Sequence, residues 1–577
     1  MSLASMVQYA LFLVVVVLLV RPVGIYLLRV FTGQKTILDR VLRPVERLIY
    51  RLAGIDAERQ MNGKQYAIAF LLFSLVGTLL LYAILRLQST LPGAPNRAYL
   101  TTPMTPDLAF NTAVSFSTTT TWQAYAGETT MSYLSQMVGL TAQNFLAGAA
   151  GLAVGVAFIR GFAGHRTDHL GSFWVDLVRA LLWVMLPVSL IGSVFLIWQG
   201  VPMNFQPYIH LTTLDGAPQI IAQGPVAALS FIEELGTNGG GFLNANAAHP
   251  YQNPTPLTNF AEMLAIVVLP AALTYTFGRM INRQREGWLL FWVMVVIFAG
   301  ALVLGGIAEQ NGNPLVTNAA HVTHVASDMQ PGGNMEGKEA RFGIGGSVLG
   351  AVATSNGATG ATNSSHDSYT PLGGLVPLTN MLLGEMVFGG LGTGLYSILF
   401  VALLGLFLTG LMVGRTPEYV GKKLGEHEVK LIAVYTLIGP VCVLLPAALA
   451  VVSSAGLAGL TTNSGPHGLT EVVYAYTSLF SNNGQTFAGL SANSPFYNIS
   501  TVIVMLLGRF GLALPALALA QRFALQPKRE LTKGTLPTDT MLFGAVIVGT
   551  ALIVVALTYL PAIALGPIVE HLQMLGR

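Results

Sequence analysis

Ten apolar stretches divide the sequence, and each is long enough to cross a lipid bilayer as a helix, which takes about 20 residues. Only 10% of the residues are charged, whereas a soluble domain usually carries about 25%. The missing charge is explained if much of the surface contacts lipid. We therefore predict an all-α polytopic membrane protein with ten transmembrane helices, near residues 5–30, 65–86, 131–159, 173–198, 257–279, 287–307, 374–412, 430–453, 495–521 and 539–564. The seventh stretch is too long for one straight helix and contains Gly389, Gly390, Gly392 and Gly394, so we predict a kink or an unwound segment there.

Positive charge alternates along the chain in a way that supports this count. Lysines and arginines follow the first, third, fifth, seventh and ninth stretches, whereas residues 200–256 and 454–492 contain neither. Cytoplasmic loops are the ones that carry excess Lys and Arg. We expect both termini on the extracytoplasmic side. The first stretch is too long for a signal peptide and lacks a basic start, so we interpret it as a spanning helix.

Several functions are disfavoured by what the sequence contains. The formal net charge of +3, without a dense basic run, does not favour a nucleic-acid partner. Cys442 is the single cysteine, so there is no internal disulfide. No histidine lies at an obvious mid-span ligand position, which disfavours a haem or quinone enzyme. A G-x-x-x-x-G-K-[ST] loop is also missing, so we expect no catalytic site and no organic cofactor on this chain, and uphill transport would need a partner that binds ATP.

Four small, uncharged polar clusters lie in the longer loops between the stretches. Each follows a moderately apolar segment too short to cross the bilayer. Setting Thr121, Gly239, Gly357 and Gly484 equivalent gives intervals of 118, 118 and 127 residues, which indicates an internal repeat. We predict fourfold pseudo-symmetric helix–pore loop–helix repeats plus two extra helices, divided as 1–64 (first helix and basic loop), 65–160, 161–286, 287–426 and 427–533 (repeats 1 to 4) and 534–577 (tenth helix).

The residue types in the clusters favour a monovalent cation. Gly and Asn reach backbone angles that aim successive carbonyls in one direction, and rings of carbonyls can replace the hydration shell of an ion. The clusters contain no carboxylate, which argues against a divalent ion. We expect K⁺ first and Na⁺ second. The candidate filter residues are Thr118, Thr119, Thr120, Thr121, Gln123, Thr237, Asn238, Gly239, Ser355, Asn356, Gly357, Asn482, Asn483 and Gly484.

Other readings of these loops stay open. The clusters could be ordinary Gly-rich surface loops, although four at matching places make that the weaker interpretation. Glu233 and Glu234 could attract cations near the mouth or pair structurally. Arg509, deep in the ninth stretch, could form an ion pair with Glu385 or act as an electrostatic barrier to straight conduction, because a charge at that depth costs about 2.5–3.5 kcal/mol.

Several longer motifs make the chain resemble the KdpA family, the potassium-binding and translocating subunits of the bacterial Kdp transport ATPase. The resemblance covers essentially the whole chain. It is carried by Gly236-Thr237-Asn238-Gly239-Gly240-Gly241-Phe242, Asn253-Pro254-Thr255-Pro256-Leu257-Thr258-Asn259, Asn334-Met335-Glu336-Gly337-Lys338-Glu339, Phe388-Gly389-Gly390 and Gly414-Arg415-Thr416-Pro417-Glu418-Tyr419.

The resemblance implies a function and partners. Potassium would enter a four-loop filter, meet a barrier formed by Gly389, Gly390, Gly392 and Arg509, and pass sideways to a KdpB-like P-type ATPase subunit. KdpC-like and small KdpF-like subunits would complete the complex in the bacterial inner membrane, surrounded by lipid. The alternative is a self-contained Trk/Ktr-like potassium channel or symporter.

The chain departs from the family pattern in the first filter segment. Thr119 and Thr121 stand where the family usually has Asn. Because Thr is β-branched and resists the left-handed backbone, we expect this segment to differ in shape from the other three.

Overall fold

The computed structural model describes residues 1–91, 95–327, 330–529 and 535–577. Within these residues, ten helices are long and apolar enough to span a membrane, which confirms the predicted number. The boundary that we predicted between residues 533 and 534 lies outside the described residues. The spans are Leu3–Phe31, Gly63–Leu87, Ser135–Ala163, Phe173–Trp198, Pro256–Met280, Gln284–Ala320, Thr393–Val413, Glu426–Val452, Pro495–Leu525 and Met541–Met574.

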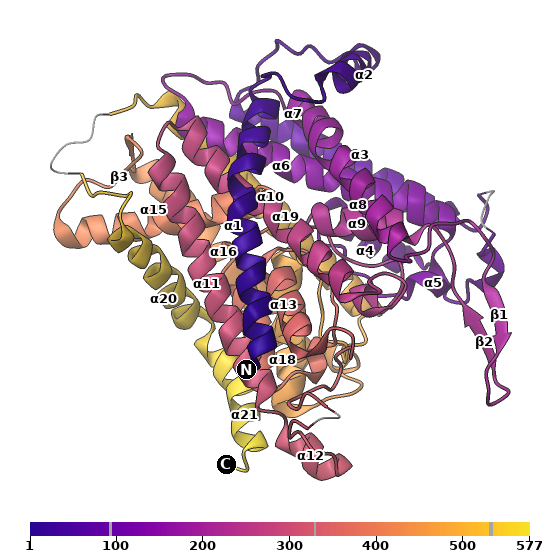
Figure 1. Cartoon of the computed structure of the whole chain (residues 1–577). Helices are drawn as coiled ribbons and strands as arrows, with labels where there is room; N and C mark the ends of the chain where they lie inside the picture. The colour runs from indigo at the N-terminus through magenta and orange to yellow at the C-terminus, as the bar shows by residue number, and fades with distance from the viewer. Residues whose placement is uncertain (92–94, 328–329, 530–534) are drawn as a thin grey trace.

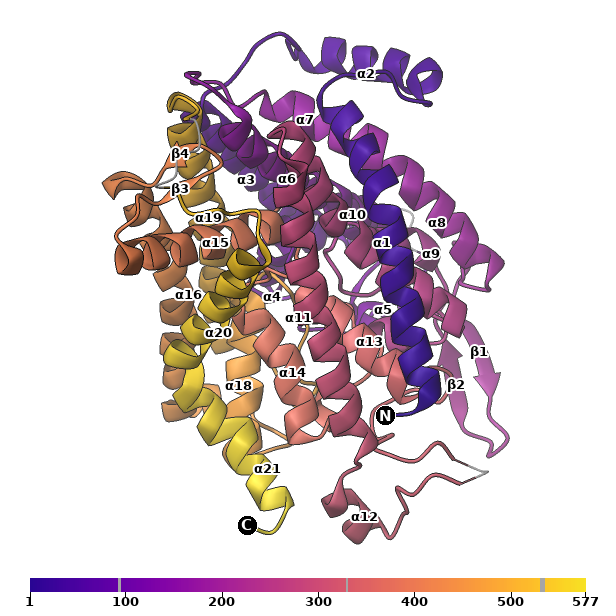
Figure 2. The same cartoon turned by 60° about the vertical axis from the view of Figure 1, so that its left-hand side comes forward.

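The spans form one bundle with both chain termini at the same end (Figures 1 and 2). In the most apolar windows, 83% of the residues of Ser135–Ala163 and 78% of those of Pro256–Met280 are buried, against 28% for Leu3–Phe31 and Gly63–Leu87. Ser135–Ala163 and Pro256–Met280 therefore form the centre of the bundle. The outer spans expose many leucines and valines, as helices that face lipid do.

Four shorter helices enter the bundle between the spans, as the sequence predicts. They are α4 (Pro106–Ser117), α9 (Val226–Leu235), α13 (Gly343–Asn356) and α18 (Gly465–Phe480). Proline stands in the first turn of α4 and α18, where its missing N–H has no partner to lose. At 10 to 16 residues these helices are too short to cross a bilayer.

The seventh apolar stretch is broken, which confirms the predicted interruption. Ten residues separate the end of helix α14 (Pro371–Leu382) from the start of α15 (Thr393–Val413). Residues 383–392 between them are irregular, and we call them the floor segment. The spanning part is thus α15 alone, so our expected start at residue 374 is wrong for the crossing helix.

The basic segment after the first span is also more ordered than we expected. Residues 39–53 form helix α2 (Asp39–Ala53), which lies across the end of the bundle opposite the termini (Figure 2).

The helices within the spans are α1 (Leu3–Phe31), α3 (Gly63–Leu87), α6 (Ala142–Ala163), α7 (Phe173–Arg179), α8 (Leu186–Trp198), α10 (Pro256–Met280), α11 (Gln284–Gln310), α12 (Pro314–Ala320), α16 (Glu426–Val452), α19 (Pro495–Leu525), α20 (Met541–Ile563) and α21 (Val569–Met574). The π-helical turns are Ser135–Thr141, Ala180–Met185 and Ala564–Ile568. The small elements are α5 (Gly127–Thr130), α17 (Ser454–Leu457), the 3-10 turns Arg97–Tyr99, Asn246–Ala248 and His366–Ser368 (η5), and the antiparallel pairs β1 (Ile209–Thr212) with β2 (Pro218–Ile221) and β3 (Glu418–Tyr419) with β4 (Lys422–Lys423).

Candidate cation pathway

The four short helices end at four loops that touch one another in the interior, and we call these the filter loops. The helices end at Thr118, Gly236, Gly357 and Ser481, and the three residues that follow each of them begin a filter loop. A helix C-terminus carries partial negative charge on its free carbonyls. Four such ends at one place favour a cation.

The backbone of the four filter loops follows one pattern. The first and third residues after each helix end have positive φ, and the residue between them does not. This alternation turns successive carbonyls towards the same side of the chain. The positive φ angles are 63° and 49° at Thr119 and Thr121, 50° and 78° at Thr237 and Gly239, 52° and 78° at Ala358 and Gly360, and 50° and 95° at Asn482 and Gly484.

The same hydrogen bond fixes the middle residue of each loop to its helix. The N–H of Thr120 donates to the carbonyl of Ser115 at 2.9 Å, and the N–H of Thr359 donates to that of Thr354 at 3.2 Å. The corresponding bonds from Asn238 to Glu233 and from Asn483 to Ser478 measure 3.0 and 2.8 Å. The middle residues are therefore structurally equivalent.

This equivalence corrects our alignment of the third loop. Ser355 and Asn356 belong to the last turn of α13, and Gly357 caps it. Thr359 and Gly360 take the places that correspond to Asn238 and Gly239. The intervals between equivalent positions are therefore 118, 121 and 124 residues.

Each filter loop packs against a carbonyl of the next loop, and together the contacts close a ring. A Cβ atom added at Gly239 would overlap the carbonyl oxygen of Thr359, and one at Gly360 would overlap that of Asn483. One at Gly484 would overlap the carbonyl oxygen of Thr120. Glycine is therefore required at all three positions, by close approach as well as by φ.

The fourth contact of the ring uses a side chain. Thr121 stands where the other loops have glycine, and its Oγ1 donates a hydrogen bond to the carbonyl of Asn238. The loops are thus joined in the order one, two, three, four and back to one. We call the carbonyl oxygens of Thr120, Asn238, Thr359 and Asn483 the carbonyl ring.

The first filter loop has the same backbone shape as the others, so our expectation of a different shape is wrong. Threonine hydroxyls hold the strained angles: Thr119 Oγ1 donates to the carbonyl of Thr118 at 2.5 Å, and the single hydroxyl hydrogen of Thr121 is shared between the carbonyls of Thr120, at 2.9 Å, and Asn238. The asymmetry lies in the side chains instead.

A small cavity of about 10 Å³ lies at the inner side of the filter loops. This is close to the space that one water molecule needs. All four loops contribute to its lining through Thr119, Thr237, Ala358 and Asn482, and it is also lined by Gly148, Gly151, Gly236, Glu385, Gly390, Leu391, Thr393, Ser481 and Arg509.

The floor segment closes this cavity by passing directly under the second and third loops. The N–H of Leu391 donates to Thr237 Oγ1 at 3.0 Å. Gly392 lies against Gly155 of α6 so closely that a Cβ on Gly155 would come within 2.6 Å of the Gly392 Cα. The segment is buried throughout except at Gly384, so backbone rather than solvent occupies the space below the cavity.

Arg509 of α19 enters the cavity from the side. One guanidinium nitrogen donates to Thr119 Oγ1 at 3.1 Å and another to the carbonyl of Ala147 at 3.0 Å. The side chains of Arg509 and Glu385 share the cavity, but they form no ion pair within 4.0 Å. The pairing that we considered from the sequence is therefore wrong, and a positive charge faces the inner side of the filter loops.

Gln123 and the pair Glu233 and Glu234, which the sequence singled out, lie next to the second filter loop. The Gln123 amide accepts from the N–H of Gly241 at 2.9 Å and donates to the carbonyl of the same residue at 3.0 Å, so it clamps the second loop. Glu233 and Glu234 are each 1% exposed on α9, so they do not line an open mouth. Glu233 accepts a hydrogen bond from Gln252 at 2.9 Å.

Comparisons with known proteins point to one family. A family described as "KdpA: Potassium-transporting ATPase A subunit" matches residues 10–572. A protein of Methylobacterium nodulans named potassium-transporting ATPase potassium-binding subunit is 51% identical over 572 residues, covering 99% of this chain and 98% of its own length. A protein of Sorangium cellulosum with the same name is 49% identical over 583 residues and matches over the whole length of both chains. Among solved structures, the potassium transporter TrkH from Vibrio parahaemolyticus aligns with 89% of this chain and 97% of its own, at 13% identity and a TM-score of 0.49.

Proposed function

The chain belongs to the KdpA family of potassium-transporting ATPase A subunits, and from this membership we propose that its carbonyl ring selects K⁺ for ATP-driven import by a partner. The observation that carries the proposal is the closed order of the four filter loops. Four equivalent carbonyl oxygens with no carboxylate among them can replace the hydration shell of a monovalent cation. Thr359 and Gly360 take the roles that the sequence suggested for Ser355, Asn356 and Gly357.

We propose further that the ion does not continue straight through the bundle. The floor segment fills the space under the filter loops, and Arg509 places a positive charge there. A K⁺ ion that passes the carbonyl ring meets both backbone and a like charge. Both features disfavour a self-contained Trk/Ktr-like channel or symporter.

A sideways exit has a candidate route. A second cavity of about 100 Å³ begins at Leu382, Leu383 and Gly384, next to Glu385 of the first cavity. It continues between α15, α16 and α20 and is lined by Ser397, Phe400, Val401, Leu404, Tyr435, Thr436, Gly439, Pro440, Phe480, Leu512, Ala551, Val554, Val555, Thr558 and Tyr559. We propose that K⁺ leaves along this side, where the ATP-hydrolysing subunit would dock.

The complex that the proposal requires has several parts. This chain would be the non-hydrolytic, potassium-binding subunit, with KdpB-like, KdpC-like and KdpF-like partners in the bacterial inner membrane. The basic loops would face the cytoplasm and both termini the opposite side. The four repeats would span residues 65–160, 161–286, 287–426 and 427–533.

Purification of the tagged chain in mild detergent tests this function. We expect a P-type ATPase subunit to copurify and its ATP hydrolysis to be stimulated by K⁺ more than by Na⁺. In liposomes, the isolated chain should give no K⁺ flux. K⁺ uptake by the chain alone, without ATP, would support the channel or symporter instead.

A further inference from the structure

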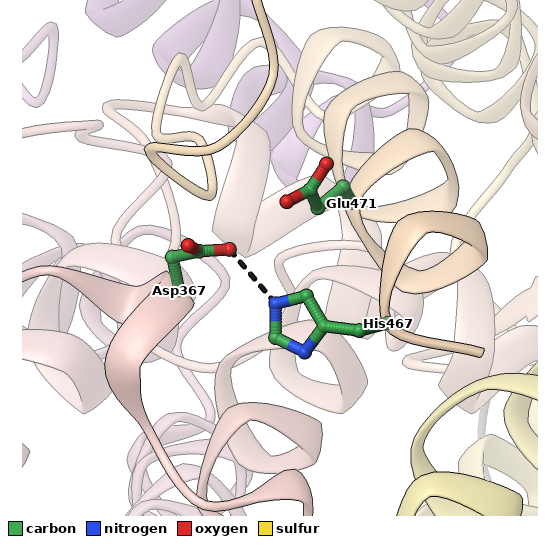
Figure 3. Close-up of side chains that lie close together, drawn as sticks. All are labelled: Asp367, His467 and Glu471. Carbon is green, nitrogen blue, oxygen red and sulfur yellow. Dashed lines mark hydrogen bonds and ion pairs between the residues drawn. The ribbon is translucent and has the colours of Figure 1, made fainter. Parts of the chain in front are cut away.

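A cluster of metal-ligating side chains lies at the end of the bundle that holds the termini, outside the carbonyl ring. His467 and Glu471 stand one turn apart on α18, and Asp367 faces them from η5 (Figure 3). One ligand atom of each residue lies within 4.8 Å of those of the other two. The i, i+4 spacing puts His467 and Glu471 on one face of the helix.

The histidine is held between two carboxylates. Its Nε2 lies 2.8 Å from Asp367 Oδ1, and its Nδ1 lies 2.8 Å from Glu570 Oε1 on α21. A metal-bound histidine commonly has this arrangement, with one ring nitrogen on the metal and the other donating to a carboxylate that orients the ring.

The cluster holds more negative than positive charge. Three carboxylates surround one imidazole, and in the part of the chain that the structure describes none of them pairs with a lysine or arginine within 4.0 Å. Glu471 is completely buried. Its Oε1 accepts from Asn463 at 2.7 Å, but its Oε2 has no hydrogen-bond partner among the described residues.

That unpartnered oxygen points to a ligand. The carboxyl groups of Asp367 and Glu471 lie close together (Figure 3), and the Asn463 amide donates to Glu471 Oε1 and, at 3.3 Å, to Asp367 Oδ2, which leaves only Glu471 Oε2 without a donor. A buried charge is costly unless it is paired, hydrogen-bonded or bound to a metal. A cation between the two carboxylates removes this cost.

We propose that Asp367, His467 and Glu471 bind a divalent transition metal of the Zn²⁺ class, with water as the fourth ligand and Glu570 orienting the imidazole. One nitrogen and two carboxylate ligands suit Zn²⁺ or Co²⁺ better than Ca²⁺ or Mg²⁺, which take oxygen ligands. Bonds of about 2.1 Å place tetrahedral ligands about 3.4 Å apart, so side-chain movements of about 1 Å complete the site. Binding replaces the proton on Nε2, which is released to solvent.

The site touches the segment that follows the fourth filter loop. The ring of Phe487 stacks on His467 with centroids 5.7 Å apart. A Cβ on Gly489 would overlap Glu471 Oε1, so the chain passes directly over the cluster. Bound metal would join η5, α18 and α21 behind this loop and restrict its movement.

Metal binding to the full-length chain in detergent tests the proposal, with an affinity tag that contains no histidine. We expect one Zn²⁺ per chain by equilibrium dialysis and elemental analysis, and no comparable Ca²⁺ binding. His467→Gln and Glu471→Gln should each weaken Zn²⁺ binding at least tenfold, and Glu570→Gln about 10- to 100-fold as a loss of the orienting partner. His321→Ala is the control, because this exposed histidine lies in the loop after α12, at the same end of the bundle.

A second measurement keeps the test independent of how well the variants fold. Co²⁺ bound to the wild-type chain should give visible absorption typical of nitrogen and oxygen ligands, and its Zn²⁺ should raise Tm. A thiolate-to-Co²⁺ charge-transfer band would place the metal at Cys442 and overturn the proposal. Failure of the wild type to bind Zn²⁺, or unchanged binding in folded His467→Gln and Glu471→Gln, would also overturn it.

Discussion

Gly484→Ala should damage the carbonyl ring without removing any side chain that could bind an ion. Gly484 has a φ of 95°, so alanine costs about 1–2 kcal/mol of backbone strain. The added Cβ would also overlap the Thr120 carbonyl oxygen, at a separation about 1 Å shorter than the 3.0 Å below which real Cβ atoms are essentially never found. Either this oxygen or the fourth loop must move.

The expected effect on ion binding follows from losing one oxygen of four. An interaction with a charged group is worth about 1.5–3 kcal/mol, so displacement of the Thr120 oxygen should weaken K⁺ binding about 10- to 150-fold. Titration calorimetry of the purified chain, or the K⁺ dependence of the complex's ATP hydrolysis, measures this. Gly465→Ala is a control for the positive φ, because Gly465 has a φ of 62° but no atom lies within 4 Å of the new Cβ.

The reasoning fails if Gly484→Ala binds K⁺ as tightly as the wild type while it remains folded. That result would mean that the Thr120 carbonyl does not touch the ion. A loss of affinity in Gly465→Ala equal to that in Gly484→Ala would attribute the effect to strain rather than to the ring.

Three other substitutions test Arg509 beside the filter and two buried lysines elsewhere in the fold. Arg509→Gln removes the charge beside Thr119 and should permit a passive Rb⁺ leak in liposomes, whereas Arg509→Lys should stay tight; no leak in Arg509→Gln would refute the barrier. Lys338→Met removes the lysine whose Nζ lies 2.7 Å from the buried Glu309 carboxylate, and it should lower the free energy of unfolding by about 3–5 kcal/mol. Thermal unfolding measures this loss and should show partial recovery in Lys338→Met/Glu309→Gln. Lys422→Met removes the buried ammonium that donates to three carbonyls, two of which keep a backbone donor, and should cost about 1.5–3 kcal/mol in the same assay. An unchanged Tm would contradict this.

Much of the fold follows from local sequence. The ten spans depend on length and apolar composition alone, and the glycines from Gly389 to Gly394 indicated the interruption near the floor segment. The segments that form α4, α9, α13 and α18 were predictable as non-crossing, because an apolar stretch of 10 to 16 residues is too short to span the bilayer.

The register of the third filter loop was not predictable in this way. Gly357 and Gly360 lie three residues apart, and the residue types around them allow either one to be the equivalent of Gly239. Ser355 and Asn356 resemble loop residues, yet burial in the bundle keeps them helical. The bond from Thr359 to Thr354 and the contact of Gly360 with the fourth loop decide the alignment, and both are tertiary.

The first loop and the metal cluster were missed for different reasons. The backbone preference of threonine argued against a left-handed conformation at Thr121, but the hydrogen bond from its hydroxyl to the Asn238 carbonyl outweighs that preference. The spacing of His467 and Glu471 was visible in the sequence as a possible helical pair. Their partner Asp367 lies 100 residues from His467 in the chain, and nothing in the sequence connects the two positions.

The most direct measurement is the position of a heavy potassium analogue in crystals of the assembled complex grown with Rb⁺. Anomalous scattering should show Rb⁺ inside the carbonyl ring, coordinated by the backbone oxygens of Thr120, Asn238, Thr359 and Asn483. A Rb⁺ peak elsewhere in the chain, with none inside the ring, would contradict the account.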